Sequence, residues 1–527
     1  MNERFPTPNK IKMNINNNHF DLNNKLFKYI NIKFISAVII LFFSSNLINA
    51  QPIISKTVKR GLDYGYNFSW DKAEKTFQSL ITKYPKDPRG YHYEASVYLW
   101  RYLSNQSKQS YNLFVEYSDT AIEKAKTLLD KHPGNPELLY ILGSDYSYRT
   151  IAFTKAEKFL DAVWASKKSD SYLSKTLSID STYYDAYLGL GLYYFGVGQI
   201  PSAFKWALSL AGIHGDKELG LKYIKLAAKE GDYSKVEAEY YLSQILSEFE
   251  FDYNSSSHYL QSLVSRYPNN LLFNYSLAAL DIKRKKLTDA ENILERIITK
   301  EDTDFNQIIS FSNFLMGDVF FKKNQFVQAK KYYLNFVSDP KNDDYKGIAY
   351  YRLAICWEIT GNRDEAEKYF KLTNKGNMDL EDDIYAKREG EIYSKRTLAN
   401  TEIDLIKFSN MIDNGKYKAA IDSLSDLLER VKTDRLKSEV YLNLSDAAYW
   451  LDKYKESLNY AELSKALNSF DEKWIKPYAC YYAARASEKL GNYSEVKKFI
   501  DEAASYSDYD YQKKLKNLLS TLSIEDK

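Results

Sequence analysis

Histidine and cysteine most often carry catalysis or bind metals, and this chain has few of either. The five histidines are His19, His92, His132, His214 and His258. None lies four residues from another histidine or near Cys356 or Cys480, so no zinc-binding spacing exists. The sequence also contains no Gly-x-Ser-x-Gly elbow and no cysteine–histidine pairing for nucleophilic catalysis. We predict no metal site, no cofactor and no enzymatic activity.

Two other patterns could suggest chemistry, and each has a simpler structural explanation. The glycines of residues 188–196 look like a phosphate loop, but their spacing is wrong and no strand precedes them. Close packing between helices accounts for them better. The acidic runs at 343–344 and 381–383 fall at expected helix starts, where the helix dipole favours carboxylates over a catalytic pair.

A recurring signature indicates the elements that position these side chains. A small residue is followed after twelve positions by a second small residue and, four positions later, by an apolar one. The copies are Gly61/Ala73/Phe77, Ala278/Ala290/Leu294, Gly317/Ala329/Tyr333, Ala354/Ala366/Phe370, Ser445/Ser457/Ala461 and Ala484/Val496/Ile500. Two antiparallel helices need small side chains where they cross and a larger one to fill the next groove.

This signature resembles the tetratricopeptide (TPR) repeat over residues 54–508. The resemblance implies an all-α, right-handed superhelical solenoid of about eleven TPR-like helical hairpins. It also implies a surface that binds partners and performs no chemistry. In agreement, proline follows the second helices in Tyr84-Pro85 and Tyr267-Pro268, and glycine marks turns at Gly361, Gly415 and Gly491.

Units two to four are longer than the family period. Their small residues lie 26, 26 and 29 positions apart, against 12 in the first unit and the other copies of the signature. The pairs are Ala95/Ala121, Gly143/Ser169 and Gly191/Gly220. We expect extended hairpins whose additional residues, about 104–117, 151–166 and 199–215, emerge on one edge of the solenoid. Their aromatic residues are the candidate partner-binding side chains: Tyr111, Phe114, Phe159, Trp164, Phe204 and Trp206.

The third of these segments allows two interpretations. Pro201 can begin a short helix and Gly212 can end it, with a broad apolar face between them. That face either plugs the solenoid interior or contacts a partner or a membrane surface through 201–211. Because large exposed apolar patches are uncommon, the plug is the preferred interpretation.

A central block is similar to a more specific family. Residues 187–194, Pro201, 212–216, Gly220-Leu221 and Ala227-Ala228 look similar to a eukaryotic TPR family linked to mitochondrial outer membranes and inclusion-body clearance. The chain differs from that family in its export-type N-terminus. We therefore transfer no functional role from it.

Composition excludes some classes of partner. The first 50 residues contribute +4 to a net charge of +3, which leaves −1 for the rest of the chain. A nucleic-acid-binding protein needs an excess of cations, so we predict no nucleic-acid partner. Most of the 47 tyrosines are expected to pack between helices with their hydroxyls at the surface. Cys356 and Cys480 are expected to be buried, unpaired thiols.

The N-terminus has the features of a secretory signal. A basic, polar lead precedes the apolar residues 34–43, and small residues end at Ala50. A run of ten apolar residues is too short for an ordinary membrane anchor. We expect export to a periplasmic or cell-envelope location after cleavage at Ala50. The alternative is an uncleaved anchor in the inner membrane.

These features suggest a domain order and three functions. The expected segments are a signal (1–50), an N-terminal array (51–375), a connecting helix (376–397), a C-terminal array (398–508) and a capping helix with a tail (509–527). The leading function is a non-catalytic scaffold that binds a protein or peptide in its concave groove. The alternatives are an envelope protein that captures a glycan or small ligand and a membrane-anchored organiser.

Overall fold

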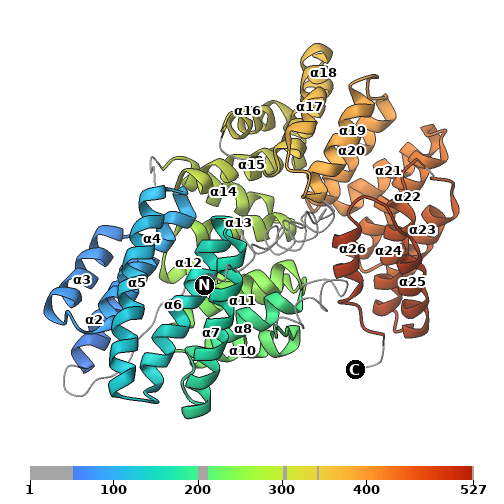
Figure 1. Ribbon diagram of the computed structural model, residues 1–527. Coiled ribbons are helices and arrows are strands. Elements are labelled where there is room, and N and C mark those ends of the chain that lie inside the picture. Colours follow the sequence, from blue (N-terminus) through green and yellow to red (C-terminus); the bar gives the residue numbers. More distant parts are fainter. Residues whose placement is uncertain (1–50, 200–211, 301–304, 341–342, 470, 525–527) are drawn as a thin grey trace, which may run out of the picture.

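The computed structural model describes residues 51–199, 212–300, 305–340, 343–469 and 471–524, and these ranges are helical (Figure 1). They contain 24 α-helices and one short 3-10 helix. The helices are α2 (Gln51–Tyr66), α3 (Trp70–Lys83), α4 (Pro88–Asn105), α5 (Lys108–Lys131), α6 (Pro136–Lys155), α7 (Phe159–Ile179), α8 (Ala186–Gly198), α10 (Lys217–Glu230), α11 (Lys235–Glu248), α12 (Tyr253–Arg266), α13 (Leu271–Lys283), α14 (Leu287–Ile298), α15 (Asn306–Lys322), α16 (Phe326–Val337), α17 (Lys346–Ile359), α18 (Arg363–Lys371), η2 (Thr373–Lys375), α19 (Glu381–Tyr393), α20 (Asn400–Asp413), α21 (Tyr417–Arg430), α22 (Asp434–Trp450), α23 (Tyr454–Ala466), α24 (Ile475–Lys489), α25 (Tyr493–Ser505) and α26 (Gln512–Leu519).

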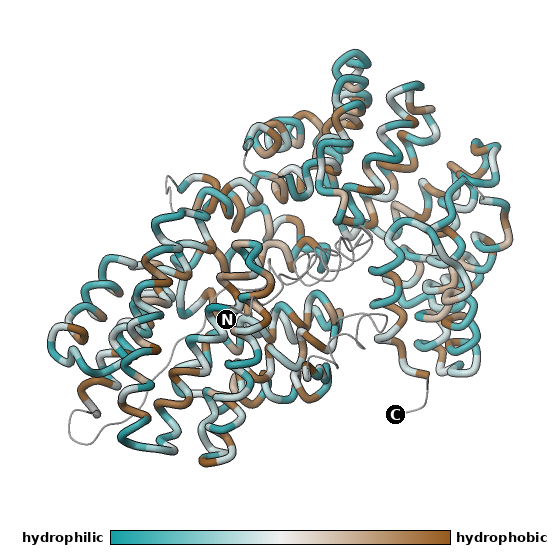
Figure 2. Tube along the Cα trace, in the orientation of Figure 1, coloured by the Kyte–Doolittle hydropathy of each residue, from teal (hydrophilic) through white to brown (hydrophobic). Residues whose placement is uncertain are grey.

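Consecutive helices pack as hairpins, which stack along the chain from the blue helices to the red ones in Figure 1. The eleven hairpins are α2/α3, α4/α5, α6/α7, α8/α10, α11/α12, α13/α14, α15/α16, α17/α18, α20/α21, α22/α23 and α24/α25. Hydrophobic and hydrophilic residues alternate along the helices in Figure 2, as expected of helices with one buried face. The predicted all-α superhelical solenoid of about eleven TPR-like hairpins is confirmed.

The small residues of the repeat signature lie where the two helices of a hairpin meet. A Cβ atom added to Gly61 would lie 2.4 Å from the ring of Phe77, and one added to Gly317 would lie 2.6 Å from the ring of Tyr333. All four residues belong to the predicted signature. The spacing therefore predicted the helix crossing correctly, because it places a small residue opposite a large one.

Turn and cap residues end the helices where the sequence predicts. α3 ends at Lys83, just before Pro85. The Asp87 side chain then accepts a hydrogen bond of 3.0 Å from the backbone N–H of Arg89 and so caps α4, which begins at Pro88. The turn glycines at 361, 415 and 491 have φ values of 84°, 71° and 73°, which glycine adopts without strain.

The extended hairpins are built from longer helices. α4 and α5 have 18 and 24 residues, and α6 and α7 have 20 and 21. In comparison, α13 and α14 have 13 and 12 residues. α8 and α10 are of ordinary length, with 13 and 14 residues, and most of the extra length of their unit is at 200–211, outside the described residues.

The first seven hairpins curve until the first meets the later ones. The side-chain amide of Asn270, in hairpin six, donates a 2.9 Å hydrogen bond to the carbonyl oxygen of Tyr66 in hairpin one. The ring of Phe68 stacks on that of Phe305 at 4.4 Å between centroids. These contacts join segments more than 200 residues apart in the sequence and close the N-terminal array on itself.

Helix α19 lies outside the hairpin series, within the residues expected to connect the two arrays. It packs against α17, and its Arg388 guanidinium forms ion pairs of 2.8 Å with both Glu472 and Asp510. The last helix, α26, buries Leu515 and Leu519 and packs against α24. Contacts between distant segments therefore also hold the C-terminal helices together.

The predicted signal, residues 1–50, lies outside the described residues. Among the residues that are described, no helix has both the length and the hydropathy needed to span a bilayer.

Candidate functional site

Tyr111 lies at the end of the extended α4/α5 hairpin and is half-buried. Its ring packs at 5.1 Å on the ring of Tyr102, and its hydroxyl accepts a hydrogen bond of 2.9 Å from the Lys158 ammonium. Lys158 belongs to the turn between α6 and α7. Tyr111 therefore joins the two extended hairpins to each other and leaves only part of its ring for a partner.

Phe114 is a core residue, so its prediction as a partner contact is wrong. Its side chain is 0% exposed, and it belongs to the same buried apolar cluster as Trp100 and Ile122. The additional turns of α5 continue the buried face of the helix. An aromatic residue in the added length can therefore extend the core as easily as it can project from the surface.

The other candidate aromatics differ in their exposure. Phe159 begins α7 and is half-buried, whereas Trp164, one turn further on, is 64% exposed. Phe204 and Trp206 lie outside the described residues, as does the membrane contact expected through 201–211. Of the six predicted partner-binding residues, Trp164 presents the largest apolar surface that the structure describes.

A second candidate site lies where the first helices of several hairpins face one another. His92 Nδ1 of α4 lies 2.9 Å from Asp145 Oδ2 of α6, and both side chains are completely buried. The Tyr66 hydroxyl of α2 donates a hydrogen bond of 3.1 Å to Glu237 Oε1 of α11. Hairpins one, two, three and five thus bring polar side chains toward the inside of the N-terminal array. We call these side chains and their neighbours the inner cluster: Tyr66, His92, Ser144, Asp145, Tyr148, Glu237 and Tyr241.

Several polar atoms of the inner cluster have no hydrogen-bond partner. They are the hydroxyls of Tyr148, Tyr241 and Ser144 and the Oδ1 oxygen of Asp145, all buried and unpaired within the part of the chain that the structure describes. Burial, together with the nearby charge of Glu237, raises the pKa of both tyrosines well above its usual value. The tyrosines therefore remain neutral and can each donate and accept a hydrogen bond.

A second sequence pattern, besides the repeat signature, marks the inner cluster: tyrosines recur at one register of the first helices. Tyr66 and Tyr148 each follow the small residue of a first helix, Gly61 or Gly143, by five positions. Tyr93 lies two positions before the small residue Ala95, which is seven residues, or two helical turns, earlier in the repeat. It is therefore on the same helix face, and it is also buried. A search for tyrosine at one register of the first helices would therefore have found this face.

The C-terminal array contains a different polar cluster, made of paired charges. Arg388 pairs with the buried Glu472, and Arg435 pairs with Glu439 at 3.1 Å. Burial and the neighbouring Glu472 raise the pKa of Glu389 to about 7. Because oppositely charged side chains lie next to one another across α19, α22 and the segment before α24, we interpret this cluster as structural.

The described residues show no cluster of metal-ligating side chains, and their two thiols are buried. Cys356 and Cys480 are free and buried, as predicted, and burial raises the pKa of the Cys480 thiol to about 12. A protonated thiol is a poor nucleophile. No group of three or more metal-ligating side chains occurs within the described ranges.

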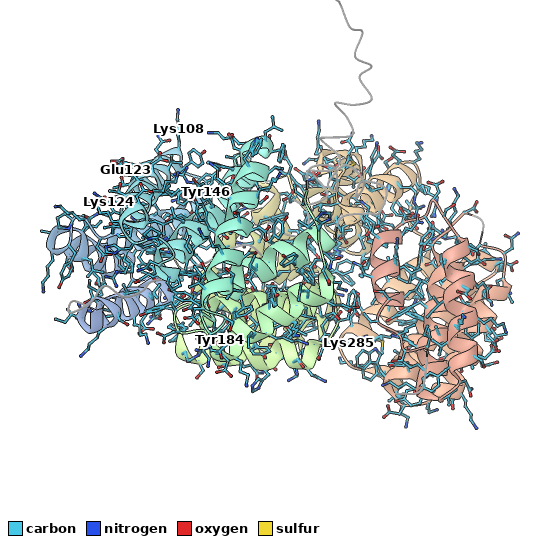
Figure 3. The ribbon with its side chains drawn as sticks, turned by 60° about the horizontal axis from the view of Figure 1, so that its bottom comes forward. Lys108, Glu123, Lys124, Tyr146, Tyr184 and Lys285 are labelled. Atoms are coloured by element: carbon cyan, nitrogen blue, oxygen red, sulfur yellow. The ribbon has the colours of Figure 1, made fainter. Side chains whose placement is uncertain are left out.

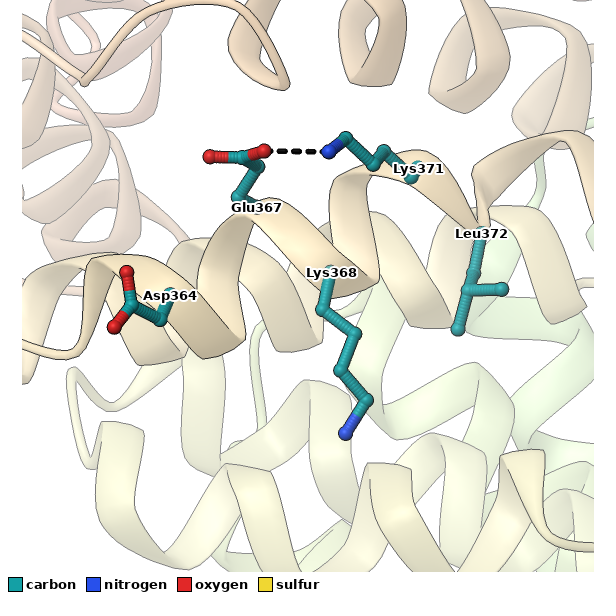
Figure 4. A pocket seen from close by; sticks show the side chains of 5 residues that line it. All are labelled: Asp364, Glu367, Lys368, Lys371 and Leu372. Carbon is teal, nitrogen blue, oxygen red and sulfur yellow. Dashed lines mark hydrogen bonds and ion pairs between the residues drawn. The ribbon is translucent and has the colours of Figure 1, made fainter.

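A shallow depression on α18 is lined by charged side chains. In Figure 4 a dashed line joins the Glu367 carboxylate to the Lys371 ammonium, while Lys368 extends away from this pair. Leu372 is the one apolar residue of the lining. The depression is an open, solvent-facing helix surface on which Glu367 pairs with Lys371, and Lys368 pairs with Glu365 next to the lining.

Comparisons with known proteins support the repeat assignment. A model of the Iml2/Tetratricopeptide repeat protein 39 family matches residues 153–381. A general tetratricopeptide repeat model matches 58–87, which is most of hairpin one and the turn after it. The similarity predicted for the central block is confirmed, and it extends well beyond that block on both sides. No curated protein matches the chain.

Several solved structures are similar at low sequence identity. Pseudomonas aeruginosa pilF is 16% identical, with 47% of this chain and 97% of that chain covered and a TM-score of 0.33. Yeast Tom70 is 12% identical, with 89% and 95% covered and a TM-score of 0.27. A chain of the APC/C hetero-tetramer Cut9-Hcn1 is 13% identical, with 88% and 95% covered and a TM-score of 0.25.

Proposed function

We propose that this tetratricopeptide-repeat protein, whose central residues are similar to the Iml2/Tetratricopeptide repeat protein 39 family, is a non-catalytic scaffold. It holds an extended segment of a protein or peptide partner against the inner cluster of the N-terminal array. The repeat fold supports the general role, since stacked hairpins create a long inner surface.

The observation that carries this proposal is the set of unpaired polar atoms in the inner cluster. Buried polar groups in folded proteins are nearly always hydrogen-bonded. Tyr148, Tyr241 and Ser144 each offer a hydroxyl, and Asp145 offers a second carboxylate oxygen. An extended peptide carries backbone N–H and C=O groups at regular intervals, and these groups would satisfy hydroxyls that can both donate and accept. Because the four side chains are buried in the unbound chain, the proposal requires the N-terminal array to open and admit the peptide.

Removal of these hydroxyls tests the proposal directly. Tyr148→Phe and Tyr241→Phe keep the ring and remove only an oxygen that has no partner within the described protein. We expect either variant to retain the melting temperature of the full chain. The affinity for a partner isolated with the wild-type chain should fall about fivefold for each lost hydrogen bond, measured by titration calorimetry.

A matched control uses a tyrosine away from the inner cluster. Tyr460→Phe alters a half-buried tyrosine on α23 that stacks on Tyr441 at 6.3 Å, and it should leave partner affinity unchanged. The proposal fails if the double variant Tyr148→Phe/Tyr241→Phe binds the partner as tightly as the wild-type chain. It also fails if either single substitution lowers the melting temperature, since the hydroxyl would then serve the fold.

We propose further that the protein is exported and cleaved after Ala50. The basic lead, the apolar residues 34–43 and the small residues before Gln51 support this proposal. N-terminal sequencing of the protein from its native source would read Gln51 as the first residue. A chain that still contains residues 34–43 would instead support the membrane-anchored alternative.

A further inference from the structure

Helix α7 has an unusual outer face for the second helix of a hairpin. Leu160 is 74% exposed and Trp164, one turn later, is 64% exposed. Leu160 has the largest exposed fraction among the exposed large apolar side chains of the described residues. Since a solvated helix face normally carries polar side chains, two such residues one turn apart indicate a surface that contacts something apolar.

The same face of α7 continues with lysines. Residues 160, 164, 167, 168, 171 and 175 follow helical spacing, so Lys167, Lys168 and Lys175 lie in line with the two apolar residues. The Lys167 ammonium lies 5.7 Å from the centroid of the Trp164 ring. Asp161 and Asp170 flank this line on either side. We call the line formed by Leu160, Trp164, Lys167, Lys168 and Lys175 the α7 ridge.

The neighbouring unit extends the positive charge. Helix α8 packs against both α7 and α10, and α10 exposes Lys222, Lys225 and Lys229 (Figure 1). Counting all their Lys, Asp and Glu residues, α7 carries +1 and α10 carries +2. The chain after residue 50 carries −1 in total, so α7 and α10 are more positive than the chain as a whole.

We propose that the α7 ridge is a membrane-surface contact that binds anionic lipid bilayers. Tryptophan and leucine partition into the boundary between headgroups and acyl chains, and tryptophan is favoured at that depth. Lysines behind them are attracted to anionic headgroups, and their attraction is lost on neutral lipid. A protein partner would need an apolar pocket and an acidic rim at this one spacing, whereas an anionic membrane presents both everywhere along its surface.

Vesicle flotation of the full chain tests the lipid preference. Vesicles of phosphatidylcholine with about one third phosphatidylglycerol should bind the protein at least tenfold better than pure phosphatidylcholine. Leu160→Ser/Trp164→Ser should lower the binding to anionic vesicles at least tenfold, while Val327→Ser, at a residue 65% exposed on α16, should not. Equal binding to the two kinds of vesicle, or no loss in the double variant, would overturn the proposal.

The lysines have a matched control in the C-terminal array. Lys167→Gln/Lys168→Gln/Lys175→Gln should abolish the preference for anionic lipid. A triple change at exposed lysines on three other second helices, Lys418→Gln/Lys455→Gln/Lys497→Gln, should leave that preference intact. Identical losses in both triple variants would show a general charge effect and contradict a contact at α7.

A local measurement separates the ridge from any membrane affinity of residues 34–43. Lipids brominated in the acyl chain quench tryptophan fluorescence on contact. The wild-type chain should be quenched more strongly than Trp164→Phe, and Trp450→Phe, at a tryptophan 42% exposed on α22, should be quenched like the wild type. The proposal is contradicted if the Trp164→Phe variant binds vesicles and its fluorescence is quenched as strongly as that of the wild type. Another segment or a bound protein would then make the contact.

Discussion

Glu94 is a carboxyl group that the fold keeps away from water. It lies on α4 with no exposed surface, and one of its oxygens accepts a hydrogen bond of 3.0 Å from the Gln78 side chain on α3. Its other oxygen has no partner among the described residues. Burial, opposed by the hydrogen bond from Gln78, raises the pKa of Glu94 to about 8. At neutral pH the folded protein therefore holds this side chain protonated.

This protonation predicts that stability falls as pH rises. The pKa of Glu94 is higher in the folded chain than in the unfolded one, so its contribution is fully present below about pH 4.5 and is lost as pH rises through about 8. The loss is at most about 1.4 kcal/mol per pH unit from this group. Glu94→Gln should flatten that dependence, measured as urea unfolding free energy between pH 5 and 9.

A nearby carboxyl provides the control for Glu94. Asp71, at the start of α3, is exposed, and Asp71→Asn should leave the slope of stability against pH unchanged. If Glu94→Gln also leaves that slope unchanged, the Glu94 carboxyl is already ionised in the folded protein at neutral pH.

At the scale of one hairpin, glycines let the backbones of α8 and α10 approach closely. A Cβ atom on Gly220 of α10 would lie 2.4 Å from the backbone nitrogen of Phe195 and 2.7 Å from the carbonyl oxygen of Gly191, both on α8. Backbone atoms cannot turn aside as a side chain can. The glycines of residues 188–196 thus serve helix packing, as the sequence suggested in preference to a phosphate loop.

We expect Gly220→Ala to destabilise the protein by about 2–3 kcal/mol, because α8 and α10 must move apart. Replacing glycine by alanine inside a helix normally stabilises the protein by about 1 kcal/mol. A loss of stability would therefore show that the close contact between α8 and α10 outweighs this gain. Lys222→Ala, at an exposed position of the same helix, should change stability by less than about 0.5 kcal/mol. Chemical denaturation of the full chain measures both, and a stabilising effect of Gly220→Ala would mean that the helices are further apart.

At the scale of the whole molecule, Lys285 joins the two arrays. It lies in the turn between α13 and α14, at the boundary between the green and the orange-red helices in Figure 3. Its ammonium lies 3.4 Å from the Asp446 carboxylate and between 5 and 6 Å from the ring centroids of Tyr417 and Trp450. Burial alone would raise the pKa of Asp446, but the positive charges of Lys285 and Arg485 hold that pKa below its usual value.

We predict that Lys285→Met weakens the contact between the arrays. The methionine side chain is similar in length but uncharged. Asp446 therefore loses one of its positively charged neighbours, and the rings of Tyr417 and Trp450 lose the cation beside them. Amide hydrogen exchange in α20 and α22 should become about tenfold faster, which corresponds to ~1.4 kcal/mol, and the radius of gyration in solution scattering should increase. Lys286→Met, at the exposed neighbour, should change neither measurement. Unaltered exchange in Lys285→Met would show that other contacts hold the arrays together.

Much of the local fold could be predicted because it depends on short spacings. The small residues at Gly61 and Gly317 and the large ones at Phe77 and Tyr333 lie within one hairpin, so their spacing alone predicts that they meet. The turn glycines and the prolines act within a few residues of their own position. These local features determine the all-α hairpin array without reference to any contact between distant segments.

Only the tertiary structure decided which distant residues meet. Tyr66 and Glu237 are 171 residues apart and come together because small rotations between successive hairpins accumulate into a closed curve. No local pattern specifies that accumulated rotation, so the sequence could not show that Tyr66 meets Glu237 or that Lys285 contacts the C-terminal array. The same reason explains Phe114 and Trp164: both are aromatic residues on extended helices, and the packing of the neighbouring helices buried one and left the other exposed.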